Sequence, residues 1–308
     1  MSLDFIIAVL VTVISAATPL LLASTGELVV EKSGVLNLGV EGMMLTGAVI
    51  AAAVTLTTGS HLLALCCAAL GGCAVALIFA VLTITLSASQ VATGLALTIF
   101  GTGFSAMFGR PYTGQAVPLL YSPFPAELAG HPVWRLVFGH SSLAYFSVLM
   151  IVAVWWFLSR TRAGLVVRAV GENDLSAHSI GYSVAGVRYL AVSFGGLMAG
   201  IAGACYPLML IPLWSERMTA GQGWIALSLV VFASWRPARL LGGAYLFGLL
   251  MAIQAYTKAG DSVFKAFPTE FITALPYLAA IVALVLISLR QRGGAAPACL
   301  GKPFIASG

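Results

Sequence analysis

Ionisable and amide side chains gather in one short segment of this sequence, residues 31–42. Four of them lie there among three glycines, directly before an apolar run: Glu31, Lys32, Asn37 and Glu41. Ionisable groups at membrane depth are costly and usually face protein or a water-filled cavity. Glycines beside them favour a discontinuous helix whose freed backbone groups line a substrate path. A cytoplasmic loop with solvated charges fits the same spacing equally well.

Asn37 and Glu41 are four residues apart, so a helical turn between them would put both on one face. The Asn37 amide can donate and accept hydrogen bonds, which suits a sugar hydroxyl or the edge of a nucleobase. An ionised Glu41 can only accept, so it would bind hydroxyl or N–H donors or pair with Lys32. The sequence therefore predicts that both residues border a substrate path. The alternative is that Glu41 anchors backbone amides that the break leaves free.

Gln90 and Thr93 form a second polar start to an apolar helix. They are three residues apart and therefore share a face. On that face they could hydrogen-bond a polar substrate. The commoner use of such side chains in helical bundles is to cap a helix or to bond a neighbouring one.

No pattern typical of an enzyme is present. The sequence has no GxSxG, no HExxH and no paired carboxylates among its apolar runs. It also has no GxxxxGK[ST] loop, so ATP would have to bind to another subunit. The five cysteines show no metal-ligand spacing. We therefore expect no catalytic residue, no metal site and no cofactor in this chain.

Composition defines the elements that must position these polar groups. Hydrophobic residues make up 60% and charged residues 8% of the 308, and the mean hydropathy is +1.02. Soluble domains carry about 25% charged residues, so a soluble enzyme and a disordered chain are both excluded. The net charge of +5 could suggest nucleic acid as a partner, but the basic residues form no stripe or arm. Basic cytoplasmic loops are the more usual cause in a membrane protein, and we expect no nucleic-acid partner.

Apolar runs long enough for a membrane helix, about 20 residues, recur along the whole chain. We expect an all-α, polytopic membrane bundle of about 8–10 spans that forms one domain, residues 1–308, with a broken or re-entrant segment at residues 24–42. Glycine spacings such as Gly196-xxx-Gly200 indicate close helix packing. The runs lie at residues 5–23, 43–57, 62–86, 91–108, 143–158, 189–213, 224–235, 240–256 and 271–289.

Lysine and arginine predict the orientation, because they are enriched in cytoplasmic loops. One side holds ten of them and the other five, and the richer side includes the loop at residues 159–187. Within that loop Asn173 or Asp174 is a plausible N-cap and Gly181 a plausible C-cap. The pattern predicts a short helix of about two turns that could dock into a groove on a soluble partner. A solvated loop is the default alternative.

Four segments together resemble the membrane permeases of ATP-binding-cassette (ABC) importers for nucleosides and simple sugars, and more distantly branched-chain amino acid and ribose permeases. They cover most of the chain in the expected order. The segments are EKSGVLNLGVEGMMLTGA (31–48), SQVATGLALTIFGTG (89–103), RAVGENDLSAHSIGYSVAGVRYLAVSFGGLMAGIAGA (168–204) and ERMTAGQGWIALSLVVFASWRPARLLGGAYLFG (216–248).

The resemblance implies a transport subunit in the bacterial cytoplasmic membrane. Its implied partners are an ATPase subunit that binds ATP and Mg²⁺, a second permease chain, identical or similar, and a periplasmic or lipid-anchored binding protein. Nucleosides or related purines are the implied substrates, with sugars next. By the same resemblance the short helix is the coupling helix that contacts the ATPase, and four of its residues have contact roles: Glu172, Asn173, Ala177 and Gly181.

Two other classes of protein compete with this interpretation. An ion-driven secondary transporter usually needs ionisable groups at mid-membrane. Here the centres of the apolar runs are almost free of charge, and Glu41 comes nearest. An intramembrane enzyme would need a paired acid, base or nucleophile, and the sequence shows none.

Overall fold

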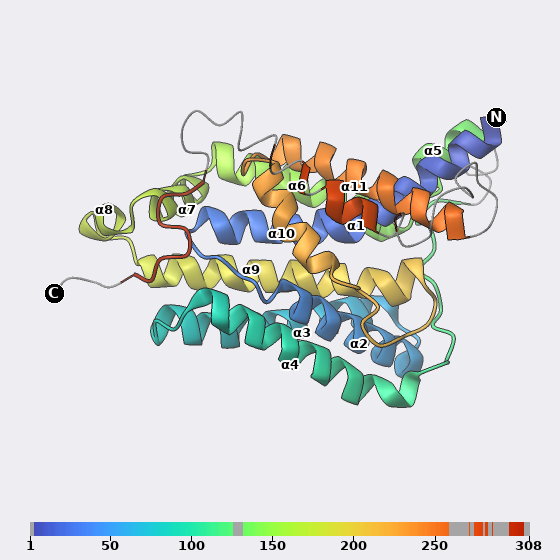
Figure 1. Ribbon diagram of the computed structural model, residues 1–308, viewed down its shortest axis with the longest axis horizontal. Helices are drawn as coiled ribbons and strands as arrows, with labels where there is room; N and C mark the ends of the chain where they lie inside the picture. Colours follow the sequence, from blue (N-terminus) through green and yellow to red (C-terminus); the bar gives the residue numbers. More distant parts are fainter. Residues whose placement is uncertain are drawn as a thin grey trace.

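The computed structural model describes residues 3–125, 132–258, 271, 274–279, 281–282, 285 and 296–304. These residues form a bundle of helices that run roughly along one axis (Figure 1). The helices are α1 (Leu3–Lys32), α2 (Val40–Thr58), α3 (His61–Ala80), α4 (Gln90–Gly109), α5 (Pro132–Phe138), α6 (Ser142–Arg160), α7 (Arg162–Glu172), α8 (Asp174–Ser179), α9 (Val184–Cys205), α10 (Gln222–Phe232) and α11 (Pro237–Lys258).

Seven helices in the described part of the chain are long and apolar enough to cross a membrane. They are α1, α2, α3, α4, α6, α9 and α11, and short π-helical turns at Val81–Thr85 and Tyr206–Leu210 lengthen α3 and α9. The prediction of an all-α, polytopic bundle is therefore confirmed. The span expected at residues 271–289 lies partly outside the described residues, which include 271, 274–279, 281–282 and 285 of that range.

The span expected at residues 224–235 is wrong. That run forms α10, which has 11 residues and is therefore about 16 Å long, roughly half of a bilayer core. Ser234 and Trp235 end it, because both have φ near +50° (50° and 54°), a left-handed conformation that a helix cannot continue. An apolar run alone does not reveal such a turn.

The expected discontinuity after the first span is present, but it is shorter than residues 24–42. The helix α1 continues to Lys32, and only residues 33–39 are non-helical, a segment called the break from here on. Gly34 in the break has a φ of +90°, which favours glycine. Figure 1 shows the chain turning at the end of α1 and running back into the bundle to begin α2.

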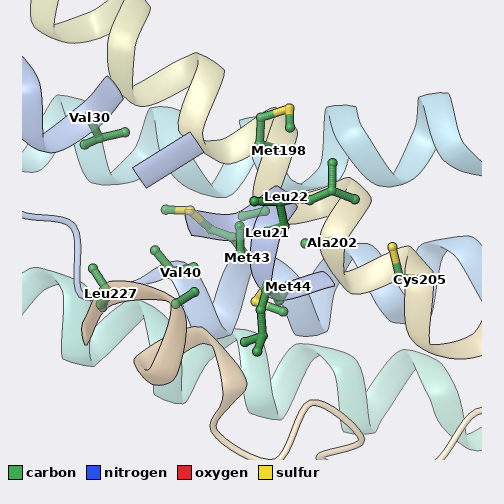
Figure 2. Close-up of a cluster of buried hydrophobic side chains, with 14 of the residues drawn as sticks. Leu21, Leu22, Val30, Val40, Met43, Met44, Met198, Ala202, Cys205 and Leu227 are labelled. Atoms are coloured by element: carbon green, nitrogen blue, oxygen red, sulfur yellow. The ribbon is translucent and has the colours of Figure 1, made fainter. Parts of the chain in front are cut away.

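The centre of the bundle is α9, which lies between α1 and α3 (Figure 1). Its glycines meet other backbones directly: a side chain at Gly196 would meet α3 at Gly72, and one at Gly200 would meet Ala68. The predicted role of these glycines in close packing is confirmed. Figure 2 shows the apolar core beside them, which contains Leu21 and Leu22 of α1, Met43 and Met44 of α2, Met198 and Ala202 of α9, and Leu227 of α10.

The polar ends of the bundle differ. Helices α7 and α8 and residues 296–304 lie together at one end, and α5 and the beginning of α1 lie at the other (Figure 1). The first end is the one for which the sequence predicts the cytoplasm, because it carries Arg160, Arg162 and Arg168.

Candidate functional site

The break is held against α1 by Asn37 and Glu27, both of which are buried. The Glu27 carboxylate accepts hydrogen bonds from the Asn37 backbone N–H at 3.2 Å and from its Nδ2 at 3.5 Å. The Asn37 Oδ1 atom accepts in turn from the Gly39 N–H at 3.0 Å. Every one of these contacts is internal, so Asn37 stabilises the shape of the break. A role for Asn37 beside the substrate path stays a prediction.

The start of α4 supports the break from the other side. The Gln90 Oε1 atom accepts from the Leu36 N–H at 2.7 Å, and the Thr98 hydroxyl donates to the Leu38 carbonyl at 3.1 Å. Gln90 therefore bonds a neighbouring segment, which is the commoner use of such a side chain. Thr93 lies one turn further along and is 8% exposed. Local patterns could not pair Gln90 with Leu36, because 54 residues separate them.

Glu41 binds the beginning of α10. Its Oε1 atom accepts from the Thr219 hydroxyl at 2.5 Å and from the Gly221 N–H at 2.8 Å, and its Oε2 atom accepts from the Gly223 N–H at 2.6 Å. The first N–H groups of a helix have no partner inside it and favour negative charge. Glu41 therefore accepts from donors at the start of the short helix α10. This agrees with the alternative in which Glu41 anchors free backbone amides.

Glu31 binds the other end of α10. Its Oε2 atom accepts from the Trp235 indole N–H at 2.5 Å, and among the described residues its buried Oε1 atom has no hydrogen-bond partner. The carboxylates of Glu31 and Glu41, one on each side of the break, thus bind the two ends of α10. Sequence reasoning placed Glu31 in the polar segment but could not predict its contact with Trp235, 204 residues away.

The predicted short helix exists as α8. Its N-cap is Asn173, whose Oδ1 atom accepts from the Ser176 N–H at 2.9 Å, and Gly181 follows it with a φ of +93°. Ala177 is 2% exposed and packs against Val170 and Val184 of the same chain. The face of α8 that a partner can reach therefore excludes Ala177. Large apolar side chains of this region, Leu175 and Ile180, are 52% and 72% exposed.

Arg188 connects α8 to the break. It lies in the second turn of α9 and is 1% exposed. Its Nη2 atom pairs with the Asp174 carboxylate at 3.1 Å, and its Nε atom donates to the Ser33 carbonyl at 3.3 Å. A third donor, Nη1, reaches the Lys302 carbonyl at 3.3 Å. The sequence predicted no individual role for Arg188, which is one of the ten basic residues on the predicted cytoplasmic side.

Residues 296–304 complete this junction. The Cys299 N–H donates to the Gly171 carbonyl at 2.9 Å, and the Gly301 N–H donates to the Gly34 carbonyl at 3.1 Å. Gly171 itself lies so close to the Lys32 carbonyl that a side chain would not fit. The end of α7, α8, the break and this C-terminal segment therefore form one packed unit at the predicted cytoplasmic end.

A multi-span bundle with a broken helix, tied to an exposed short helix, is an arrangement that membrane transport proteins use. Comparison with known proteins gives the family. A family model described as "Branched-chain amino acid transport system / permease component" matches residues 9–289, and the chain belongs to this family.

Relatives of this chain carry names of transport permeases. It is 44% identical over 262 residues to "Putative glucose ABC transporter permease protein TsgC13" of Haloferax volcanii, an alignment that covers 83% of this chain and 80% of that protein. It is 31% identical to the guanosine ABC transporter permease protein NupQ of Bacillus subtilis, over 94% of this chain and 93% of that one. Identity to the nucleoside ABC transporter permease protein NupC of Lactococcus lactis is 28%, over 88% and 89%. The chain is thus a multi-pass ABC transporter permease of the importer type.

Proposed function

We propose that this chain is the permease subunit of an ATP-driven importer in the cytoplasmic membrane, that it works by alternating access, and that it carries nucleosides or related purines. The main support for this mechanism is the pair of bonds that Arg188 makes. They connect the exposed helix α8 to the break between α1 and α2. A movement of an ATPase docked on α8 would reach the discontinuous helix through these bonds.

The proposal of a neutral substrate is supported by the buried carboxylates, which already accept hydrogen bonds from the protein. Glu27 and Glu41 accept hydrogen bonds through both oxygens, and Glu31 does so through one. These groups satisfy protein donors, and a site built around them would suit a neutral polar solute better than an ion. The names of NupQ and NupC favour nucleosides. The identity to TsgC13 favours a simple sugar as the second candidate.

The proposal includes three protein partners. An ATPase subunit would hold ATP and Mg²⁺, a second permease chain, identical or similar, would complete the pathway, and a periplasmic or lipid-anchored binding protein would deliver the solute. On this chain we assign the ATPase contact to α8 and its flanks, including Glu172, Asn173 and Gly181, which are exposed. Ala177 would support that contact from beneath.

Transport by the reconstituted complex tests the proposal. Proteoliposomes that hold the permease, its ATPase and its binding protein should take up labelled guanosine when ATP is present on the ATPase side. Collapse of ion gradients should leave this uptake unchanged. Uptake of glucose and not guanosine would select the second candidate, and uptake that needs a gradient but no ATP would contradict the proposal.

The exposed face of α8 gives a specific prediction. Replacing Leu175 or Ile180 by Asp should weaken ATPase binding roughly thirtyfold, the effect of losing one interface hot spot of about 2 kcal/mol. Binding of the purified ATPase to the permease in detergent measures this. The matched control is Leu62→Asp, since Leu62 is 74% exposed at the opposite end. Equal losses in the control and the α8 variants would remove α8 from the interface.

Thr93 remains our candidate for the substrate path, together with Gln90. A Thr93→Cys variant, in a chain whose five native cysteines are replaced, should react with a small polar thiol reagent during transport, and substrate should slow the reaction. A Thr98→Cys variant provides the control, because Thr98 is bonded to the break. Complete inertness of the thiol introduced by Thr93→Cys, in every transport state, would contradict the assignment.

A further inference from the structure

An apolar groove of about 650 Å³ lies where α6, α7 and α9 meet, and Val29 of α1, four residues before the break, also lines it. Its walls include Met150 and Phe157 of α6, Val167 of α7, and Leu190 and Phe194 of α9. The groove is open, since Leu190 is 75% exposed. Its volume falls within the roughly 300–1,000 Å³ typical of small-molecule sites. The walls, however, offer almost no polar group that a ligand could bind. Tyr182 at one end is the exception.

The groove extends from the membrane interior to the predicted cytoplasmic surface. Met150 and the end of α6 at Arg160 are ten residues apart, about 15 Å along the helix. Beyond that end the groove continues past Ala163, in the first turn of α7. Figure 1 shows α7 at the end of the bundle, beside the ends of α6 and α9. An occupant would therefore be apolar along its length and reach the interface with one end.

Two arginines lie close in sequence to lining residues at that end: Arg160 follows Phe157 by three residues, and Arg162 directly precedes Ala163. Arg160 is the last residue of α6 and Arg162 the first of α7, and both are exposed. In the part of the chain that the structure describes, neither has a carboxylate within 4.0 Å. Anionic headgroups of the cytoplasmic leaflet attract basic side chains at this depth. An apolar groove with basic residues at its mouth matches the chemistry of an anionic phospholipid.

We propose that the groove binds one acyl chain of an anionic phospholipid, whose phosphate lies against Arg160 and Arg162. The bound chain would fill the space between α6 and α9 and support α7, whose Val167 lines the groove and whose last turn leads into α8. The lipid is thereby a structural ligand of the coupling region. This inference depends on the proposed function only for the orientation of the chain, and binding is measurable without transport.

Lipid retention by the purified full-length chain tests the proposal. Native mass spectrometry after delipidation and addition of phosphatidylglycerol or phosphatidylcholine should show about 25-fold preference for the anionic lipid, because each of the two arginines contributes about fivefold. The double variant Arg160→Gln/Arg162→Gln should lose that preference while still binding both lipids weakly. Equal retention of both lipids by the parent chain would overturn the proposal.

A second pair of variants tests the groove itself. Ala153→Trp places a large side chain in it, and Ala163→Phe does so nearer the mouth. Both should reduce retention of phosphatidylglycerol at least tenfold, with helix content unchanged by circular dichroism. The control is Leu149→Phe, on an exposed part of α6 that does not line the groove. Unchanged lipid retention in both filled variants would overturn the proposal, and a change confined to their oligomeric state would show that a second copy of the chain covers the groove instead.

Discussion

Replacing Glu41 by Ala is expected to unfold the inner part of the permease, because three donors, two of them buried and one partly buried, lose their acceptor at once. These donors are the Thr219 hydroxyl and the N–H groups of Gly221 and Gly223. A buried donor left unpaired costs about 1–3 kcal/mol, so the sum approaches the whole stability of a typical domain, about 5–15 kcal/mol. The melting temperature in detergent and the yield of assembled complex measure the effect.

Two further variants sharpen this test. Glu41→Gln keeps one acceptor oxygen but turns an amide donor toward a donor of α10, so an intermediate loss of stability is expected. Glu216→Ala removes an exposed carboxylate near the same loop and should change stability by less than about 0.5 kcal/mol. If Glu41→Ala assembles and melts like the parent and loses only uptake, Glu41 serves the substrate path and is not an anchor.

Replacing Arg188 by Leu is expected to disconnect α8 from the break. The variant leaves the Asp174 carboxylate without its cation and the Ser33 carbonyl without a donor. Removing one partner of a buried ion pair costs about 3–5 kcal/mol. The surviving complex should hydrolyse ATP with little transport. The ratio of solute transported to ATP hydrolysed, measured in proteoliposomes, reports this loss of coupling.

Arg239→Leu is the matched control, because Arg239 is exposed at the same end of the bundle. Asp174→Asn separates the two kinds of bond: it weakens the ion pair but leaves the Arg188 bond to Ser33 in place. We expect it to retain more coupling than Arg188→Leu. A transport-to-ATP ratio for Arg188→Leu equal to that of the control would refute the coupling role.

Local sequence patterns predicted most of the fold. The spans follow from runs of apolar residues, the N-cap of α8 follows from Asn173, and the turn after its C-cap, Ile180, follows from Gly181. All three are decided by side chains within a few residues of each other. The break was predicted from its glycines, but its length was not. Ser24 and Thr25 bond carbonyls one turn earlier in α1, so the helix tolerates polar residues and continues to Lys32.

The contacts of the site were beyond prediction because they join distant parts of the chain. Nothing near Glu41 in the sequence indicates Thr219, 178 residues away, and nothing near Glu31 indicates Trp235. The same limit applies to Ala177. The resemblance gave it a contact role, whereas the position of Val184 places it inside the chain's own packing. A bulky residue at Ala177 would therefore disturb folding and docking together.

The hydrogen bonds at both ends of α10 restrict which parts of the molecule can move separately. Since Glu31 and Glu41 lie on opposite sides of the break, the end of α1, the start of α2 and α10 must travel as one rigid body. The glycines Gly196, Gly200 and Gly203 of α9 lie against the backbones of α2 and α3, where they present no side chain of their own. Such a surface permits the small sliding steps known as shear motion. A change of access between the two sides of the membrane would then arise from sliding along α9, and the glycines of the break would serve as a fixed corner and not as a hinge.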